Sequence, residues 1–170
     1  MSLSKTERLI LANQYRILAL LEPDQAESHD TIREALENGY VAAYERVFDW
    51  IDDDLTEEDC RLVVDSLTVY EALHRSAQKM ADKTGIDERL LSYPGFDGNN
   101  EAQHLGYLRH VVRKEGRFDY LKFDSKDLNS HMPMIPIYER MISKHAEFGE
   151  HLDLSPGEAR AIFDAMRHRG

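Results

Sequence analysis

The chain has 170 residues, of which 42% are hydrophobic and 31% are charged, and its formal net charge at pH 7 is −11. A domain of this length buries about 70% of the surface that its unfolded chain exposes, so it can hold a core without disulfides or structural metals. The 21 Lys and Arg residues are scattered among acids, which argues against nucleic acid as a partner, because a phosphate backbone binds gathered cations.

The first element in chain order is a helix over about residues 5–21, which Pro23 ends. Asn13 and Gln14 lie inside it and flank its apolar stripe. Buried amides need hydrogen-bond partners, and each lost partner costs about 1–3 kcal/mol. We interpret these two amides as packing residues that fix the register of the helix, with ligand binding as the alternative. The apolar stripe is expected to face the core: Ile10, Ile17, Leu20 and Leu21, widened by Leu9 and Leu18.

A second helix is predicted after Pro23. It ends at the dipeptide Asn38-Gly39, because glycine suits the left-handed conformation that terminates many helices. Three of its residues are expected to face inward: Ile32, Ala35 and Leu36. A third helix is predicted directly afterwards, since apolar residues recur at helical spacing without the alternation of a strand: Tyr40, Tyr44, Val47, Phe48 and Ile51.

The longest helical pattern runs from residue 57 to about residue 84. Thr56 is its predicted N-cap, Asp59 is the fourth position of a weakened capping box, and Gly85 ends the helix. Apolar residues wrap more than half of its circumference. This pattern predicts a long helix at the centre of the fold.

A Gly-rich bend over residues 93–98 leads into a further helix, which Gly116 ends. The inward face of this helix is unusual, because Glu101, His104 and Glu115 share it with apolar residues. Burying an unpaired carboxylate costs several kcal/mol, so these groups either pair within the core or line a site. The sequence leaves both alternatives open.

An irregular segment follows over about residues 118–136, and two helices close the chain. The first of them spans about residues 137–147. The second begins at Ser155, where Ser155-Pro156-Gly157-Glu158 forms a capping box with proline at the first helical position. Taken in order, the elements predict an all-α, single-domain bundle of about seven helices over residues 1–170.

Two Glu-x-x-His pairs suggest a metal site: Glu71 with His74, and Glu101 with His104. Residues three apart share a helix face, and two such pairs, with a Glu from each of two further helices, hold the metals of di-iron bundles. Those bundles place another long helix between the pairs, whereas residues 85–99 are too few and too rich in Gly and Pro to form one. A metal-binding protein or enzyme built on these four residues is therefore the alternative to ion pairing and packing.

No catalytic residue and no cofactor are predicted from the sequence. Ser130 and His131 are adjacent, but neighbours in sequence seldom present a hydroxyl and an imidazole to each other. No orienting acid or oxyanion donor accompanies them.

Several segments in combination resemble the YfbU-like family of small bacterial proteins, and they extend over nearly the whole chain: residues 8–15 (RLILANQY), 70–74 (YEALH), 95–97 (GFD), 105–107 (LGY), 115–117 (EGR) and 129–134 (NSHMPM). The resemblance implies an all-helical, cytoplasmic and self-associating protein whose biochemical activity is not established. It supplies no catalytic residues.

The sequence is therefore interpreted as a cytoplasmic protein that forms a homo-oligomer or binds an unidentified protein partner, away from membranes. No apolar run approaches the roughly 20 residues of a membrane span, and Lys5–Arg8 interrupt any signal-peptide pattern. Cys60, the only cysteine, agrees with a reducing compartment. Two surfaces are expected to face partners if they are exposed: Tyr40 with Tyr44 and Phe48, and Met132 with Met134 and Met141.

Overall fold

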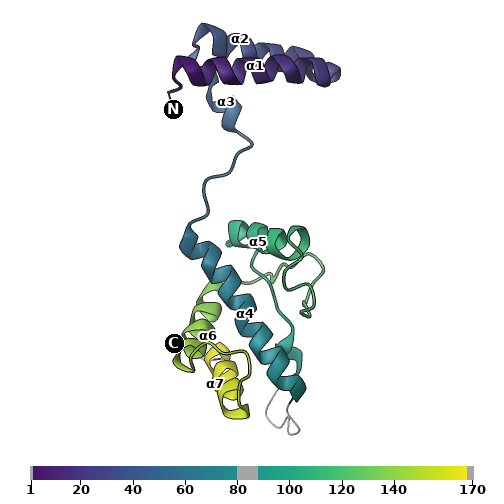
Figure 1. Cartoon of the computed structure of the whole chain (residues 1–170), viewed down its shortest axis with the longest axis vertical. Helices are drawn as coiled ribbons and strands as arrows, with labels where there is room; N and C mark the ends of the chain where they lie inside the picture. Colours follow the sequence, from purple (N-terminus) through teal and green to yellow (C-terminus); the bar gives the residue numbers. More distant parts are fainter. Residues whose placement is uncertain (1, 80–87, 168–170) are drawn as a thin grey trace. The chain divides into compact units, whose positions relative to one another are not determined.

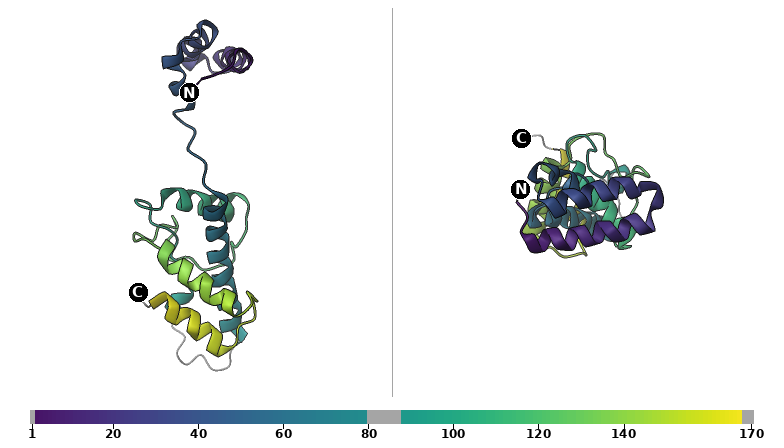
Figure 2. Two further views of the ribbon diagram at one scale, coloured as in Figure 1. Left: turned by 90° about the vertical axis from the view of Figure 1, so that its left-hand side faces the viewer. Right: turned by 90° about the horizontal axis from the view of Figure 1, so that it is seen from above.

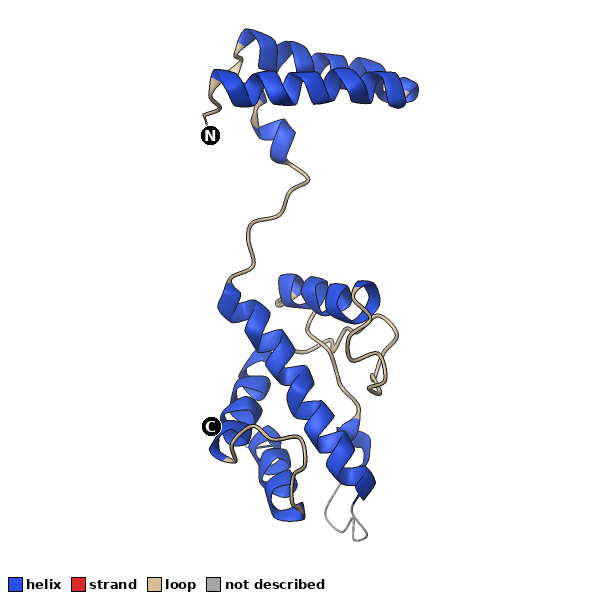
Figure 3. Ribbon diagram, in the orientation of Figure 1, coloured by secondary structure: helices blue, strands red, loops and turns tan. Residues whose placement is uncertain are grey.

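The structure is a computed structural model that describes residues 2–79 and 88–167. Within these ranges it has seven α-helices and no strand, apart from two isolated bridges (Figure 3). The all-α prediction of about seven helices is confirmed. The chain forms two compact units, residues 1–54 and 55–170. Two compact units can belong to one cooperatively folding domain. The single domain over residues 1–170 therefore stays a prediction.

The first unit is built on an antiparallel hairpin of α1 (Lys5–Leu21) and α2 (Ala26–Asn38), as Figure 1 shows. Ser4 and Glu7 cap α1 reciprocally, because the Ser4 hydroxyl accepts from the Glu7 N–H and the Glu7 carboxylate accepts from the Ser4 N–H. Gly39 ends α2 with a φ of 76°. Both predicted helices and the glycine stop are confirmed.

The predicted third helix is wrong in its extent. Only α3 (Glu45–Phe48) is α-helical, after a 3-10 turn over Val41–Ala43. The cause lies at the end of α2, where the Tyr40 N–H donates to the Ala35 carbonyl at 2.9 Å. Tyr40 therefore belongs to the stop of α2, with a ψ of 85° that is not helical. A small core closes this unit: Ala12, Leu36, Tyr44 and Val47.

The second unit is organised around α4 (Glu57–Lys79), the longest helix of the described residues. The Thr56 hydroxyl caps it by accepting from the Asp59 N–H at 3.1 Å, as predicted. The predicted end at Gly85 lies outside the described residues. Helix α5 (Ala102–Arg109) packs against α4, and α6 (Ile135–Glu147) and α7 (Pro156–Arg167) lie side by side along it (Figure 2). The prediction of a central helix is confirmed for its described part.

The remaining helices follow the predicted order after a 3-10 turn over Glu88–Leu91. Helix α5 (Ala102–Arg109) continues as a π-helical turn over His110–Lys114. The segment from 117 to 134 has no helix, which confirms the irregular loop. Helices α6 (Ile135–Glu147) and α7 (Pro156–Arg167) complete the unit. The N–H groups of Ser155 and Glu158 bond to each other's side chains, as the capping box predicts.

Aromatic residues fill the centre of the second unit. The rings of Tyr93 and Tyr138 stack at 5.3 Å, and Tyr70 meets both edge-on. The Tyr93 hydroxyl shares a hydrogen bond with Ser66, while the Tyr138 hydroxyl donates to the Gly95 carbonyl at 2.7 Å. Burial raises the pKa of all three tyrosines. They are therefore neutral packing groups at physiological pH.

Gly95 is the tightest point of this packing, and its replacement tests the fold. Its φ is +94°, and a Cβ atom there would lie 1.8 Å from the Leu128 carbonyl oxygen. We expect Gly95→Ala to lower the free energy of unfolding by at least about 3 kcal/mol in urea titrations followed by circular dichroism.

Gly106→Ala is the matched control. It lies within α5 with no atom within 4 Å of the added Cβ, so it should stabilise the protein by about 0.5–1 kcal/mol. Equal effects of the two substitutions would contradict the close approach of the Gly95 and Leu128 segments.

Candidate functional site

Exposed apolar side chains gather in the first unit. Of eleven large apolar residues that are exposed among those described, nine lie within residues 1–54. Single exposed apolar residues are ordinary, but a contiguous group marks an interaction surface. The helical hairpin is therefore the first candidate for a functional surface.

Five of these residues lie along α1, with exposed fractions from 53% at Ile10 to 80% at Leu20 within this unit. Together with two amides between them they form the surface that we call the α1 face: Leu9, Ile10, Asn13, Gln14, Ile17, Leu20 and Leu21. The sequence predicted that its apolar stripe faces the core. That prediction is wrong for the first unit, because the stripe is uncovered there.

The composition of α2 explains the exposure. A neighbouring helix covers one side of α1, and the covered side carries Ala12, which packs with Leu36 of α2. The inward residues of α2 are few, and one of them is the small Ala35. They cannot cover an apolar arc as wide as that of α1. This signal was present in the sequence, as a mismatch between the apolar widths of two adjacent helices.

Asn13 and Gln14 lie at the middle of the α1 face, and both are exposed. No hydrogen bond joins either amide to another described residue. The sequence interpretation gave them a packing role in the core. The structure places them at the surface instead, where their donors and acceptors are free for a partner.

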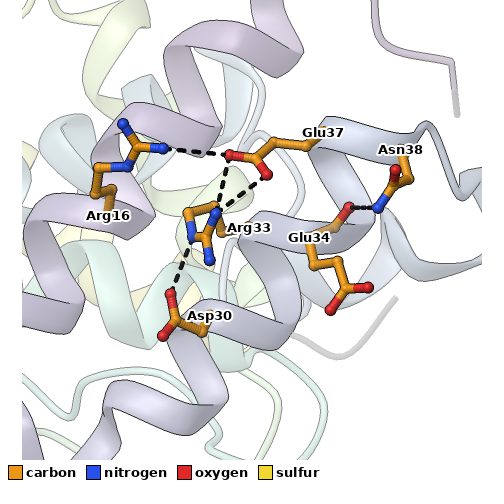
Figure 4. A network of polar contacts seen from close by, with 6 residues as sticks. All are labelled: Arg16, Asp30, Arg33, Glu34, Glu37 and Asn38. Carbon is orange, nitrogen blue, oxygen red and sulfur yellow. Dashed lines mark hydrogen bonds and ion pairs between the residues drawn. The ribbon is translucent and has the colours of Figure 1, made fainter.

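The edge of the α1 face next to α2 is polar. Arg16 lies 3.7 Å from Glu37, and Arg33 bonds to both Glu37 and Asp30 (Figure 4). The hydrogen bonds that the Arg33 guanidinium donates to Asp30 and Glu37 raise the pKa of Arg33. Exposed ion pairs of this kind are screened by water and contribute little to stability. The network therefore orients the hairpin more than it stabilises it, and it gives the apolar face a charged border.

Glu101 pairs within the core, which is one of the two alternatives that the sequence left open. One carboxylate oxygen accepts from the N–H groups of Met134 and Ile135 at 2.7 and 2.9 Å, and the other accepts from the Asp97 N–H at 2.9 Å. Met134 and Ile135 begin α6. Glu101 therefore caps a helix 33 residues away in sequence and favours it through the helix dipole.

The loop that precedes Glu101 is closed by further side-chain bonds. Asp97 accepts from the Asn99 N–H at 3.2 Å and from the side-chain amide of Asn100. These bonds, that of Asn100 first, lower the pKa of the Asp97 carboxyl. The Asn129 side chain accepts from the Gly98 N–H at 3.1 Å. Every polar group named here has a partner within the fold, which favours a structural role for this loop.

His104 and Glu115 do not join Glu101 in a common site. His104 lies 3.1 Å from Asp59, and its ring lies 5.4 Å from that of Phe96. The Thr56 hydroxyl, with a smaller contribution from His104, lowers the pKa of Asp59. Glu115 is at the surface and pairs with His110 and Arg117. The three ionisable residues of this helix thus have three separate environments.

Glu71 and His74 line a shallow pocket of about 580 Å³ on α4 with Arg75, Gln78, Lys79 and Tyr120. His74 bonds to Gln78 at 2.8 Å, and Glu71 lies 3.7 Å from Arg75. Partial burial, aided by Glu71, raises the pKa of Tyr120 to about 12. These polar groups are already paired with one another, apart from Lys79, which bonds to Asp153.

The two Glu-x-x-His pairs are not brought together. His104 meets α4 at Asp59, and Glu71 lies twelve residues further along that helix, a rise of about 18 Å. No group of three or more His, Cys, Asp or Glu side chains in the described residues is arranged to hold a metal ion.

The two partner-facing surfaces suggested by the sequence are only partly exposed. Tyr40 is exposed, but Tyr44 is buried and Phe48 is half-buried. Met132 is exposed, whereas Met134 and Met141 are buried. Neither set forms a continuous apolar surface, which leaves the α1 face as the largest candidate.

The fold and this surface define the class as a small all-α protein with an exposed apolar face on its first helix. The YfbU domain matches residues 1–165 of the chain. The chain therefore belongs to the YfbU family, as the resemblance of its segments predicted. Among the described residues, no helix has the length and hydropathy needed to cross a membrane.

Replacement of Glu101 tests its assignment as a helix-capping group. Glu101→Gln turns an amide NH2 toward a backbone N–H, so we expect unfolding in urea to require about 2–4 kcal/mol less free energy. Glu115→Gln removes a carboxylate that makes only surface ion pairs and should change stability by no more than about 0.5 kcal/mol. A Glu101→Gln variant with unchanged free energy of unfolding would refute the capping role.

Proposed function

We propose that the protein acts through self-association, and that the α1 face is the contact between its copies. The observation that carries this proposal is the row of exposed Leu and Ile residues on α1, with two unpaired amides at its centre. A soluble protein seldom leaves such a row in water unless another surface covers it. We also infer that the protein works in the cytoplasm, which its single free cysteine supports.

The free energy gained by burying the α1 face is large enough, set against the cost of association, to support a dimer. The exposed parts of the five apolar side chains amount to roughly three complete Leu or Ile side chains per copy, and burying each contributes about 1.5–3 kcal/mol. Two copies together gain about 9–18 kcal/mol. Association itself costs about 4–15 kcal/mol. The gain exceeds the cost over most of these two ranges, so the α1 face carries enough apolar area to support a dimer.

Ile17→Glu tests the proposal directly, because it places a charge at the centre of the apolar row. We expect the unaltered protein to be dimeric at tens of micromolar in size-exclusion chromatography with light scattering. The variant should be monomeric, with a dissociation constant at least about 100-fold higher, since each dimer loses two buried side chains and gains two desolvated charges.

Ile51→Glu is the matched control. Ile51 belongs to the same unit and is 54% exposed, against 55% for Ile17, but it lies outside the α1 face. It should leave the dimer intact, and circular dichroism should show native helix content for both variants. A monomeric unaltered protein would overturn the proposal, as would a dimer that Ile51→Glu disrupts and Ile17→Glu does not.

A further inference from the structure

We propose that the acidic segment 52–58 of one copy binds in a cationic groove between α1 and α2 of another copy. This inference rests on the proposed function, because it requires two copies to meet. It adds a contact that the α1 face does not contain, and it makes association depend on charge. The groove and the segment complement each other in charge and in spacing.

The groove lies entirely within the first unit and has a volume of about 540 Å³, which is the size of an ordinary ligand pocket. Residues 1–54 contain five Lys and Arg residues and twelve Asp and Glu residues. Three of the five cations line this one groove: Lys5, Arg8 and Arg16. Their spacing of three and eight residues places them on the same side of α1. Like charges gathered there repel one another, so the groove favours an anionic occupant.

These cations are poorly compensated by the acids around them. Arg8 donates to the Leu36 carbonyl at 3.1 Å, a bond that orients its guanidinium and leaves its charge unpaired. Among the described residues, neither Arg8 nor Lys5 forms an ion pair with a carboxylate. Arg16 lies 3.7 Å from Glu37, but both oxygens of Glu37 already accept hydrogen bonds from Arg33 (Figure 4). The groove therefore offers positive charge to a ligand.

Apolar side chains lie between the two ends of the groove. Leu9 and Ala12 are between Arg8 and Arg16 along α1, and Leu36 of α2 packs with Ala12. Arg8 and Arg16 are about 12 Å apart along the helix axis, because eight residues separate them. A matching ligand therefore has two anionic groups at about this distance, with an apolar group between them.

The chain contains such a segment just before α4. Residues 52–58 read DDDLTEE, and within them Asp53 and Glu57 lie on either side of Leu55. Residues 52–56 have no helix or turn, and the acids at 52–54 and 57 are exposed. Four residues of extended chain span about 13 Å. This length is close to the separation of Arg8 and Arg16 along α1.

The helix dipole accounts for only part of this acidic run. Glu57 and Glu58 lie in the first turn of α4, where negative charge is favourable. The three aspartates at 52–54 precede that turn, and the effect of the dipole falls off within it. Nucleic acid is a poorer occupant of the groove, because it has no apolar side chain between its charges and a chain of net charge −11 repels it. A second copy supplies both the acids and the leucine.

A charge swap in the full chain tests the contact. The groove variant carries Lys5→Glu and Arg16→Glu, at two exposed positions, and the segment variant carries Asp53→Lys and Glu57→Lys. Each variant alone sets like charges against each other, so its dissociation constant at low salt should rise at least about tenfold in light scattering. In an equal mixture, the segment of each variant meets a groove of opposite charge on the other. Association should then return to within about threefold of that of the unaltered protein.

Asp119→Lys combined with Glu139→Lys is the control for the segment variant. Both acids are exposed in the second unit, and their replacement changes the net charge by the same amount. This control should associate like the unaltered protein, and circular dichroism should show native helix content for every variant. Should the groove variant lose helix content, Lys5→Glu alone takes its place.

The outcomes separate this contact from the proposed function. A monomeric unaltered protein would overturn self-association, and the groove contact with it. A dimer that the groove and segment variants keep as tightly as the control does would overturn the groove contact and leave the α1 face standing. The groove contact is equally overturned if both variants are weakened and their mixture associates no more tightly than either alone.

Discussion

A hairpin of two helices can cover only one side of each helix, and this constraint governs the first unit. The side of α1 that meets α2 buries Ala12 against Leu36. The opposite side of α1 exposes its Leu and Ile residues to water, although this side is as apolar as the core-facing side of a buried helix. We propose that a further surface covers this side of α1, which links the local helix pattern to self-association.

In the second unit, the apolar faces of the helices are covered by other helices of the same unit. Its long helix α4 is covered by α5, α6 and α7, and its aromatic centre is closed. Glu101 is the polar counterpart of this packing, because its carboxylate joins the start of α6 to the loop before α5 through three backbone N–H groups. A buried carboxylate is stable only when such donors satisfy it. Glu101, which the sequence offered as a candidate metal ligand, therefore has a structural role.

Local signals predicted the helices well, because caps and breakers act over a few residues. Gly39, Thr56 and Ser155 each mark a helix boundary where expected. The candidate site was harder, since periodicity identifies an apolar face and cannot say what covers it. The role of Glu101 could not be predicted either, because two of the N–H groups that it binds are at the start of a helix 33 residues away in sequence. The small number of apolar residues on the inward side of α2 was the one local sign that α1 is left uncovered.

The burial of the α1 face can be measured most directly by NMR of the isoleucine methyl groups in the full-length protein, with a soluble paramagnetic agent added. If copies associate through this face, the methyl groups of Ile10 and Ile17 are shielded at high protein concentration and become relaxed on dilution, whereas that of Ile51 is relaxed throughout. Equal relaxation of the Ile17 and Ile51 methyl groups at high concentration would contradict self-association through α1.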